Sequence, residues 1–141
     1  MTALQHFSNL SLLGHRQSYG SAIDQFNRRE FWECHETLED VWRATPYPLR
    51  FFYHSIIKTA VGFHHLSRHN RHGARVKLTD GVRLLWLFPP RYLGVYTKRL
   101  LDETAAWLRL LESETCPDWS TLDFQPIPTI RAEALPKDAG H

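Results

Sequence analysis

The segment that decides the fold covers residues 26–42 and reads Phe-Asn-Arg-Arg-Glu-Phe-Trp-Glu-Cys-His-Glu-Thr-Leu-Glu-Asp-Val-Trp. At 100° per residue, Phe31, Leu38 and Trp42 fall on one side of a helix, and Cys34 and Val41 flank them. This spacing predicts an amphipathic helix whose apolar face packs against the rest of the chain.

His35 falls inside that apolar arc, and Glu39 sits one turn later at its edge. With Glu36 they form the spacing His-Glu-x-x-Glu, in which the first and last residues project to the same side of a helix. A histidine where a leucine would pack better needs a partner, because a buried polar group without a hydrogen bond is costly. The segment therefore predicts a polar cluster on a face that is otherwise dry.

Other helices are predicted on both sides of this segment, at residues 18–27, 48–70, 74–87 and 96–112. Prolines 46 and 48 separate residues 26–44 from the third helix, and Pro48 suits the first turn of that helix. The third helix is apolar nearly all the way round, which places it at the centre. We expect an all-α fold, a compact five-helix bundle packed around the central third helix.

The domain boundaries follow from composition. Residues 1–16 are predicted to form a flexible N-terminal arm, residues 17–113 the helical bundle, and residues 114–141 an extended, Pro-containing tail packed on the bundle. Within these parts the sequence makes further predictions about burial. Trp86 is expected to face inward on the fourth helix, and the tail is expected to lie on the bundle through Trp119, Leu122, Phe124 and Ile127.

The third helix carries one polar stripe, in which His54, Lys58, His65 and His69 recur at helical spacing. Gly62 lies in the same stripe and would let another helix approach closely. Beyond the stripe, the segment 70–73 ends the helix, with Asn70 or Gly73 as the residue expected to take a left-handed cap conformation.

Composition limits the class of protein. Of the 141 residues, 43% are hydrophobic and the net charge is +2, so the chain is globular and its charge does not by itself argue for nucleic acid. Two cysteines give no disulfide framework, and no apolar run approaches 18 residues. We expect a soluble, cytoplasmic protein that does not enter a membrane.

Two segments resemble a known family. Residues 26–42 match its pattern F-N-x-x-x-F-x-x-x-H-E-x-x-E-x-x-W, and residues 65–74 match its second stretch, H-L-x-x-x-N-x-x-G-A. The chain is similar, over roughly residues 20–90, to the DUF309 family of small helical proteins. The resemblance implies a compact bundle with one central helix, and no reaction. Lys58 stands where the family tends to have glutamine, and His69 where it tends to have glycine, which adds basic groups beside the shared histidine.

Three interpretations of the polar cluster stay open, with the first favoured. His35 and His65 form a buried network with Glu39 and Lys58 that fixes the helix register. Alternatively His35, Glu39 and His65 hold a divalent metal ion such as Mn, Fe or Zn. In the third interpretation the cluster is a pocket for an organic ligand or for acid–base chemistry. The residues assigned to the cluster are His35, Glu36, Glu39, Lys58, His65 and Asn70.

A basic run at the junction of the third and fourth helices includes Arg68, Arg71 and Arg75. It suits a polyanion such as nucleic acid, although no aromatic residues alternate with the charges as an RNA surface requires. Nucleophilic catalysis has little support, because Cys34 and His35 are consecutive and point about 100° apart on a helix.

The sequence therefore predicts a binding or interaction module built on the His35, Glu39 and His65 cluster. Its partner is a small ligand or another protein, and a homo-oligomer stays open. The alternatives are a metal-dependent hydrolase that uses the same residues and a polyanion binder that uses the basic corner. The catalytic residues of any such enzyme are not identified.

Overall fold

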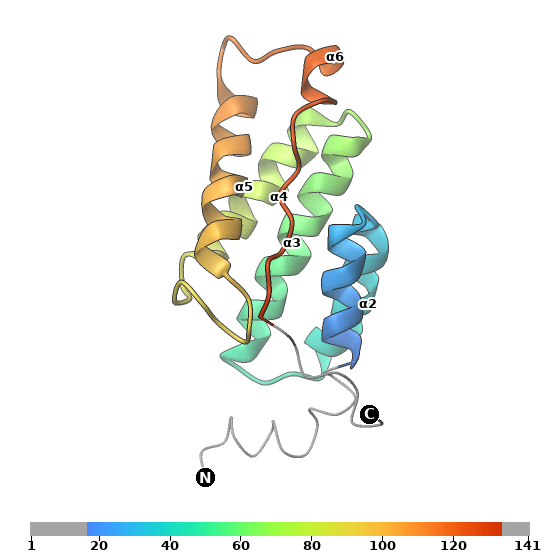
Figure 1. The fold of residues 1–141 in the computed structure, drawn as a ribbon, viewed down its shortest axis with the longest axis vertical. Coiled ribbons are helices and arrows are strands. Elements are labelled where there is room, and N and C mark those ends of the chain that lie inside the picture. Colours follow the sequence, from blue (N-terminus) through green and yellow to red (C-terminus); the bar gives the residue numbers. More distant parts are fainter. Residues whose placement is uncertain (1–16, 134–141) are drawn as a thin grey trace.

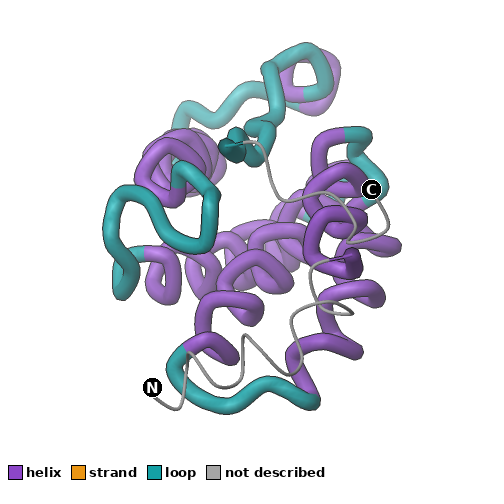
Figure 2. The backbone as a smooth tube through the Cα atoms, turned by 60° about the horizontal axis from the view of Figure 1, so that its bottom comes forward, coloured by secondary structure: helices purple, strands orange, loops and turns teal. Residues whose placement is uncertain are grey.

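The computed structural model describes residues 17–133, and the regular elements in them are helices joined by loops (Figures 1 and 2). A helix over residues 17–27 is followed by α2 (Phe31–Arg43), α3 (Leu49–Ser67), α4 (Arg71–Leu85), α5 (Thr97–Glu112) and the short α6 (Trp119–Leu122). The described residues contain no strand, only two isolated bridges at Val95. The predicted all-α class is confirmed. The predicted N-terminal arm lies outside the described residues.

Helix α3 is the centre of the bundle, as the sequence predicts. It packs against α2 on one side and α4 on the other, and twelve of its nineteen residues are buried. Three of its large side chains, Phe52, Ile56 and Phe63, are completely buried. A helix that is apolar nearly all round is stable in water only when its neighbours cover it, and here they do.

Helices α3 and α4 approach closely because each has a glycine at the crossing. A Cβ atom added to Gly62 would lie 2.5 Å from a methyl carbon of Leu78, and one added to Gly81 would overlap the hydroxyl of Thr59. In the two contacts, Gly62 with Leu78 and Thr59 with Gly81, the residue numbers add up to the same value. This is the pattern expected of two antiparallel helices in one register. The predicted role of Gly62 as a point of close helix approach is confirmed.

The last described segment runs back along the bundle between α5 and α2, in front of α3 (Figure 1). Asn27 fixes it there, because its side chain accepts a hydrogen bond from the backbone N–H of Ile130 at 2.6 Å and donates one to the Ile130 carbonyl at 3.0 Å. Ile130 is buried. An asparagine in the first family motif thus joins two segments that are about a hundred residues apart in the chain.

Three predictions about the junction of α3 and α4 are wrong. The third helix ends at Ser67, not at residue 70. The residue with left-handed backbone is His69, with φ 58°, because Asn70 is the N-cap of α4 and Gly73 already lies inside that helix. His69 therefore leaves the polar stripe, since its side chain no longer follows the helical spacing of residues 54, 58 and 65.

Two predictions about burial are also wrong. Trp86 is 74% exposed, because α4 ends at Leu85 and the chain turns there before reaching the core. Phe124 is 88% exposed, whereas Leu122 is buried and Trp119 and Ile127 pack on the core. The tail also forms the short helix α6, which the prolines around it did not suggest. The boundaries predicted at residues 16 and 113 stay predictions.

No helix within residues 17–133 combines the length and the apolar content that a bilayer crossing requires.

We predict that Gly62→Ala destabilises the protein by about 1–3 kcal/mol, because the added methyl group overlaps Leu78 in a packed interface. Gly20→Ala is the matched control. Gly20 is also helical, but a Cβ there has nothing within 4 Å, so the same change should stabilise by about 0.5–1 kcal/mol. Urea unfolding of both variants measures the difference. Equal effects would contradict the tight crossing.

Candidate functional site

The polar residues singled out by the sequence lie on neighbouring parts of α2, α3 and α4. On α2, the Nε2 atom of His35 lies 2.8 Å from a carboxylate oxygen of Glu39. The other oxygen of Glu39 lies 3.6 Å from Arg43, so this carboxylate has two partners. The His35 side chain is 17% exposed and that of Glu39 33%. Glu36 is exposed and lies outside the pair.

The second ring nitrogen of His35, Nδ1, is buried and has no hydrogen-bond partner. The imidazole is flanked by the indole of Trp32, with ring centres 4.6 Å apart. Trp32 in turn contacts His64 of α3 at 5.0 Å. The His35–Glu39 pair is therefore held on α2 by its own helix, and Trp32 links its imidazole to His64 of α3.

Ring contacts between α2 and α3 show which residues of the two helices lie at the same height along the bundle axis. Trp32 contacts His64, and Trp42 contacts His54 at 5.1 Å, so the two helices run antiparallel with a fixed register. In this register His35 is level with Val61, four residues before His65. Four residues of helix correspond to about 6 Å along the axis. The two histidines are therefore offset by about one helical turn along the bundle.

His65 is positioned by the turn between α3 and α4. Its Nδ1 atom lies 3.3 Å from the side-chain nitrogen of Asn70. The Asn70 carbonyl oxygen accepts a hydrogen bond from the backbone N–H of Gly73 at 2.9 Å and so caps α4. A Cβ atom on Gly73 would lie 2.8 Å from the His65 ring and 2.7 Å from Asn70. The second family motif is thus a cap with a histidine packed onto it, and glycine leaves the space for both.

Lys58 faces α4, not the His35–Glu39 pair. Its ammonium lies 3.9 Å from the Asp80 carboxylate, and the side chain of Lys77 lies beside it. From here on, the polar stripe means five residues and no longer includes His69: they are His54, Lys58 and His65 of α3, and Lys77 and Asp80 of α4. All five side chains are half-buried.

Burial and crowding of like charges lower several pKa values in the polar stripe. The pKa of Lys58 is lowered first by burial and then by the charge of Lys77, and Asp80 only partly offsets these effects. The pKa values of His54 and His65 are also lowered, in both cases mainly by burial. Lysine charges add to this effect, Lys58 at His54 and Lys77 at both histidines. The stripe therefore holds cationic groups with too little negative charge nearby.

The metal interpretation does not fit the described residues. Within residues 17–133 no group of three His, Cys, Asp or Glu side chains comes together as metal ligands would. His35 and Glu39 converge, but His65 is one helical turn away and paired with Asn70. The predicted network joining His35, Glu39, His65 and Lys58 is therefore divided into two parts, one on α2 and one along α3 and α4.

The basic corner does not merge with the polar stripe. Arg68 caps the end of α3, and Arg71 and Arg75 lie one turn apart in the first turns of α4. Arg75 and Lys77 are two residues apart on α4 and so point to nearly opposite sides of that helix. The predicted polyanion site stays a separate prediction.

Cys34 is a core residue, as its place in the apolar arc predicts. It is completely buried, and burial raises the pKa of its thiol to about 12. A thiol with such a high pKa is a poor nucleophile. Cys34 and Cys116 are both free.

Sequence reasoning missed the aromatic residues that border these groups. Trp32 separates His35 from His64, and Trp42 lies between His54 and Arg50, whose guanidinium is 4.4 Å from the centre of the indole ring. Trp32 precedes His35 by three residues, a spacing that places both on the same helix face. That signal was present in the sequence, whereas the contact with α3 was not.

The comparisons with known proteins agree with this architecture. Residues 19–76 match the family described as "Domain of unknown function (DUF309)", and over this part of the chain the predicted resemblance to the DUF309 family is confirmed. The match contains both motifs, from Phe26 in the last turn of the helix over residues 17–27 to Gly73 in the first turn of α4.

A relative is the "Uncharacterized protein YpuF" of Bacillus subtilis, which is 36% identical over 58 residues. The match covers 40% of this chain and 33% of the relative, so it spans about a third of the relative's length.

We predict that Asn70→Ala destabilises the protein by about 1 kcal/mol, the usual cost of a lost N-cap. Asn70→Asp is the matched variant, because it keeps the acceptor for Gly73 but replaces the group beside His65 with a carboxylate. This variant should retain most of the stability and raise the pKa of His65 above its value in the wild-type protein. Denaturant unfolding and an NMR titration of the imidazole test the two effects. An unchanged His65 pKa in Asn70→Asp would contradict the contact.

Acid should destabilise the protein through His54 and His65. Both have pKa values below 6.5 in the folded state, so the unfolded chain binds more protons as pH falls. Their contribution to stability is complete above pH 6.5 and is lost as pH falls through the folded pKa values. The double variant His54→Gln, His65→Gln should flatten the dependence of the unfolding free energy on pH between about 7.5 and 5. The charged or titratable groups that act on these two rings are Arg50, Lys58, His64, Lys77 and Asp80. The same slope in both proteins would contradict the assignment.

Proposed function

We propose that this protein is a binding module that holds a small anionic ligand on the polar stripe. The observation that carries the proposal is the pairing of two lysines, Lys58 and Lys77, on facing helices beside one carboxylate. Among residues 17–133, Lys77 forms no ion pair, and Lys58 reaches Asp80 only at 3.9 Å. Two neighbouring ammonium groups with only one carboxylate near them favour the binding of an anion between them.

The helix crossing supports this interpretation. Gly62 and Gly81 bring α3 and α4 close together, which places the side chains of Lys58 and Lys77 beside each other at this crossing. The two like charges repel each other, and an anion between them would relieve this repulsion. His54 and His65 extend the same face in both directions and supply further donors when they are protonated.

The His35–Glu39 pair has a framework role in this proposal. It lies on α2 beside Trp32, which packs on His64 and so holds α2 against the polar stripe. The contact between His35 Nε2 and Glu39 is made within one helix and orients the imidazole against Trp32. We therefore place ligand contact at Lys58 and Lys77, and orientation of α2 at His35 and Glu39.

The metal-dependent hydrolase is not favoured. The charge of Lys77 acts on His65, one of the three proposed ligands, and would repel a divalent cation there. The three proposed ligands also fail to converge. For the polyanion binder, no specific contact of Arg68, Arg71 or Arg75 favours it over a solvated basic corner.

Lys58→Met tests the proposal, because it keeps the length and apolar stem of the side chain and removes the charge. With citrate as the probe, calorimetry at low salt should show about threefold to tenfold weaker binding by the variant. The affinity of the wild-type protein should fall as salt is added, since partly exposed charges are screened.

Lys98→Met is the matched control. Lys98 is an exposed lysine on α5 that pairs with Asp102, away from the polar stripe, so its loss should leave citrate binding unchanged. Equal weakening by both variants would reduce the effect to net charge and contradict the site. Absence of citrate binding to the wild-type protein at millimolar concentration would contradict an anion site of this kind.

A further inference from the structure

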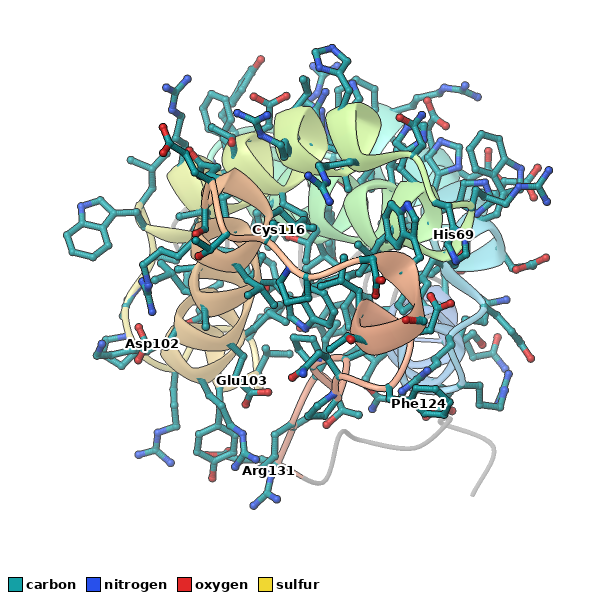
Figure 3. All side chains as sticks on the ribbon, turned by 90° about the horizontal axis from the view of Figure 1, so that it is seen from above. His69, Asp102, Glu103, Cys116, Phe124 and Arg131 are labelled. Carbon is teal, nitrogen blue, oxygen red and sulfur yellow. The ribbon has the colours of Figure 1, made fainter. Side chains whose placement is uncertain are left out.

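A cavity of about 340 Å³ lies at the end of the bundle where α3 finishes, away from the polar stripe. Three separate parts of the chain form it: the turn before α2, the last turn of α3, and the segment around α6. Figure 3 looks onto this end of the molecule and shows His69 beside the short α6 helix. The volume is at the lower end of the range typical of pockets for small organic molecules.

The cavity has an apolar floor and a polar rim. The floor consists of Phe31, Leu66 and Leu122, which are buried, and of Ile127, which is half-buried. The rim carries charged and polar groups from residues that are exposed. An apolar body with one polar end fits this division, whereas a fully hydrated ion would leave the floor without a partner.

One side of the rim is rigid. The imidazole of His69 stacks on the indole of Trp119, with ring centres 4.4 Å apart and planes 9° from parallel. Its Nε2 atom lies 3.0 Å from each carboxylate oxygen of Asp123. Within the described part of the chain the other ring nitrogen, Nδ1, makes no hydrogen bond. The imidazole is therefore fixed in orientation and keeps one polar atom for a ligand.

Arg29 supplies a free positive charge on the other side of the rim. Its neighbour Arg28 forms an ion pair with Glu30 at 3.3 Å, whereas Arg29 has no ion pair among residues 17–133 and lines the cavity. Arg29 and His69 also share left-handed backbone, with φ values of 63° and 58°. Glycine adopts this conformation at lower cost, so two non-glycine residues that border this cavity occupy strained backbone positions.

We propose that this cavity binds a small organic monocarboxylate with a flat apolar body. The carboxylate pairs with the guanidinium of Arg29, whose parallel N–H donors match the two oxygens of a carboxylate. The apolar body lies on Phe31, Leu66 and Ile127, beside the stacked rings of Trp119 and His69.

Asp123 lowers the affinity of the cavity for anions of higher charge. Its carboxylate is on the rim and repels each negative charge that enters, so a dianion such as a phosphate ester is disfavoured more strongly than a monoanion. A neutral analogue of the same shape lacks the charge that pairs with Arg29. The selectivity expected is therefore for one negative charge on an apolar body, which distinguishes this cavity from the polar stripe with its preference for several charges.

Phenylacetate is the probe, and its neutral analogue phenylacetamide is the comparison. In the wild-type protein, NMR titration should move the indole N–H signal of Trp119, identified by its absence in Trp119→Phe, and phenylacetate should bind more tightly than phenylacetamide. Arg29→Gln removes the charge and keeps an unbranched side chain at the strained position. It should weaken phenylacetate binding roughly 10- to 100-fold, the equivalent of one charge-assisted hydrogen bond, and leave phenylacetamide unchanged.

Arg28→Gln is the control, because it removes the same charge from the adjacent residue, which does not line the cavity. Its phenylacetate affinity should equal that of the wild-type protein. Four results would overturn the proposal: no binding of phenylacetate at 10 mM, equal affinity for the acid and the amide, equal loss in the two arginine variants, or binding without a shift of the Trp119 signal. These four results do not depend on the citrate experiment with Lys58→Met, so the two proposals can fail separately.

Discussion

The close contact between α3 and α4 is the constraint on which the rest of the structure depends. Gly62 lies against Leu78, and Gly81 lies against Thr59, so the two backbones approach more closely than side chains at these positions would allow. This contact fixes the antiparallel register of the two helices. The register in turn sets Lys58 beside Asp80 and Lys77 and leaves space at Gly73 for the ring of His65.

The two motifs of the DUF309 family have structural roles in this fold. In the first, Phe26 and Phe31 pack edge to face in the core, and Asn27 binds both backbone groups of Ile130. In the second, Asn70 caps α4 and reaches His65 above Gly73. The first motif thereby joins segments that are distant in the chain, and the second fixes the junction of α3 and α4.

The groups proposed to bind ligands lie at positions where the fold leaves charge unpaired. Lys77 on α4 has no ion pair in the described residues, and Arg29 before α2 has none either, although the adjacent Arg28 is paired. Some surface cations pair within one helical turn, as Lys98 does with Asp102 and Arg99 with Glu103, whereas others in the described residues, such as Arg68, Arg71 and Arg75, form no ion pair. Lys77 and Arg29 are distinguished by their surroundings, because Lys77 lies beside Lys58 and Arg29 lines a cavity with an apolar floor.

The sequence by itself determined the helices, the central position of α3, the close approach at Gly62 and the pairing of His35 with Glu39. Each of these depends on helical periodicity or on i, i+4 spacing, which are local properties of the chain. The tertiary structure alone decided that His35 and His65 are one turn apart, that Lys58 faces Asp80, and that His69 turns toward Trp119 and Asp123. These outcomes depend on the register between helices and on one left-handed residue. Neither is encoded in the spacing of a single helix, because both follow from how the glycines, rings and caps of different segments fit together.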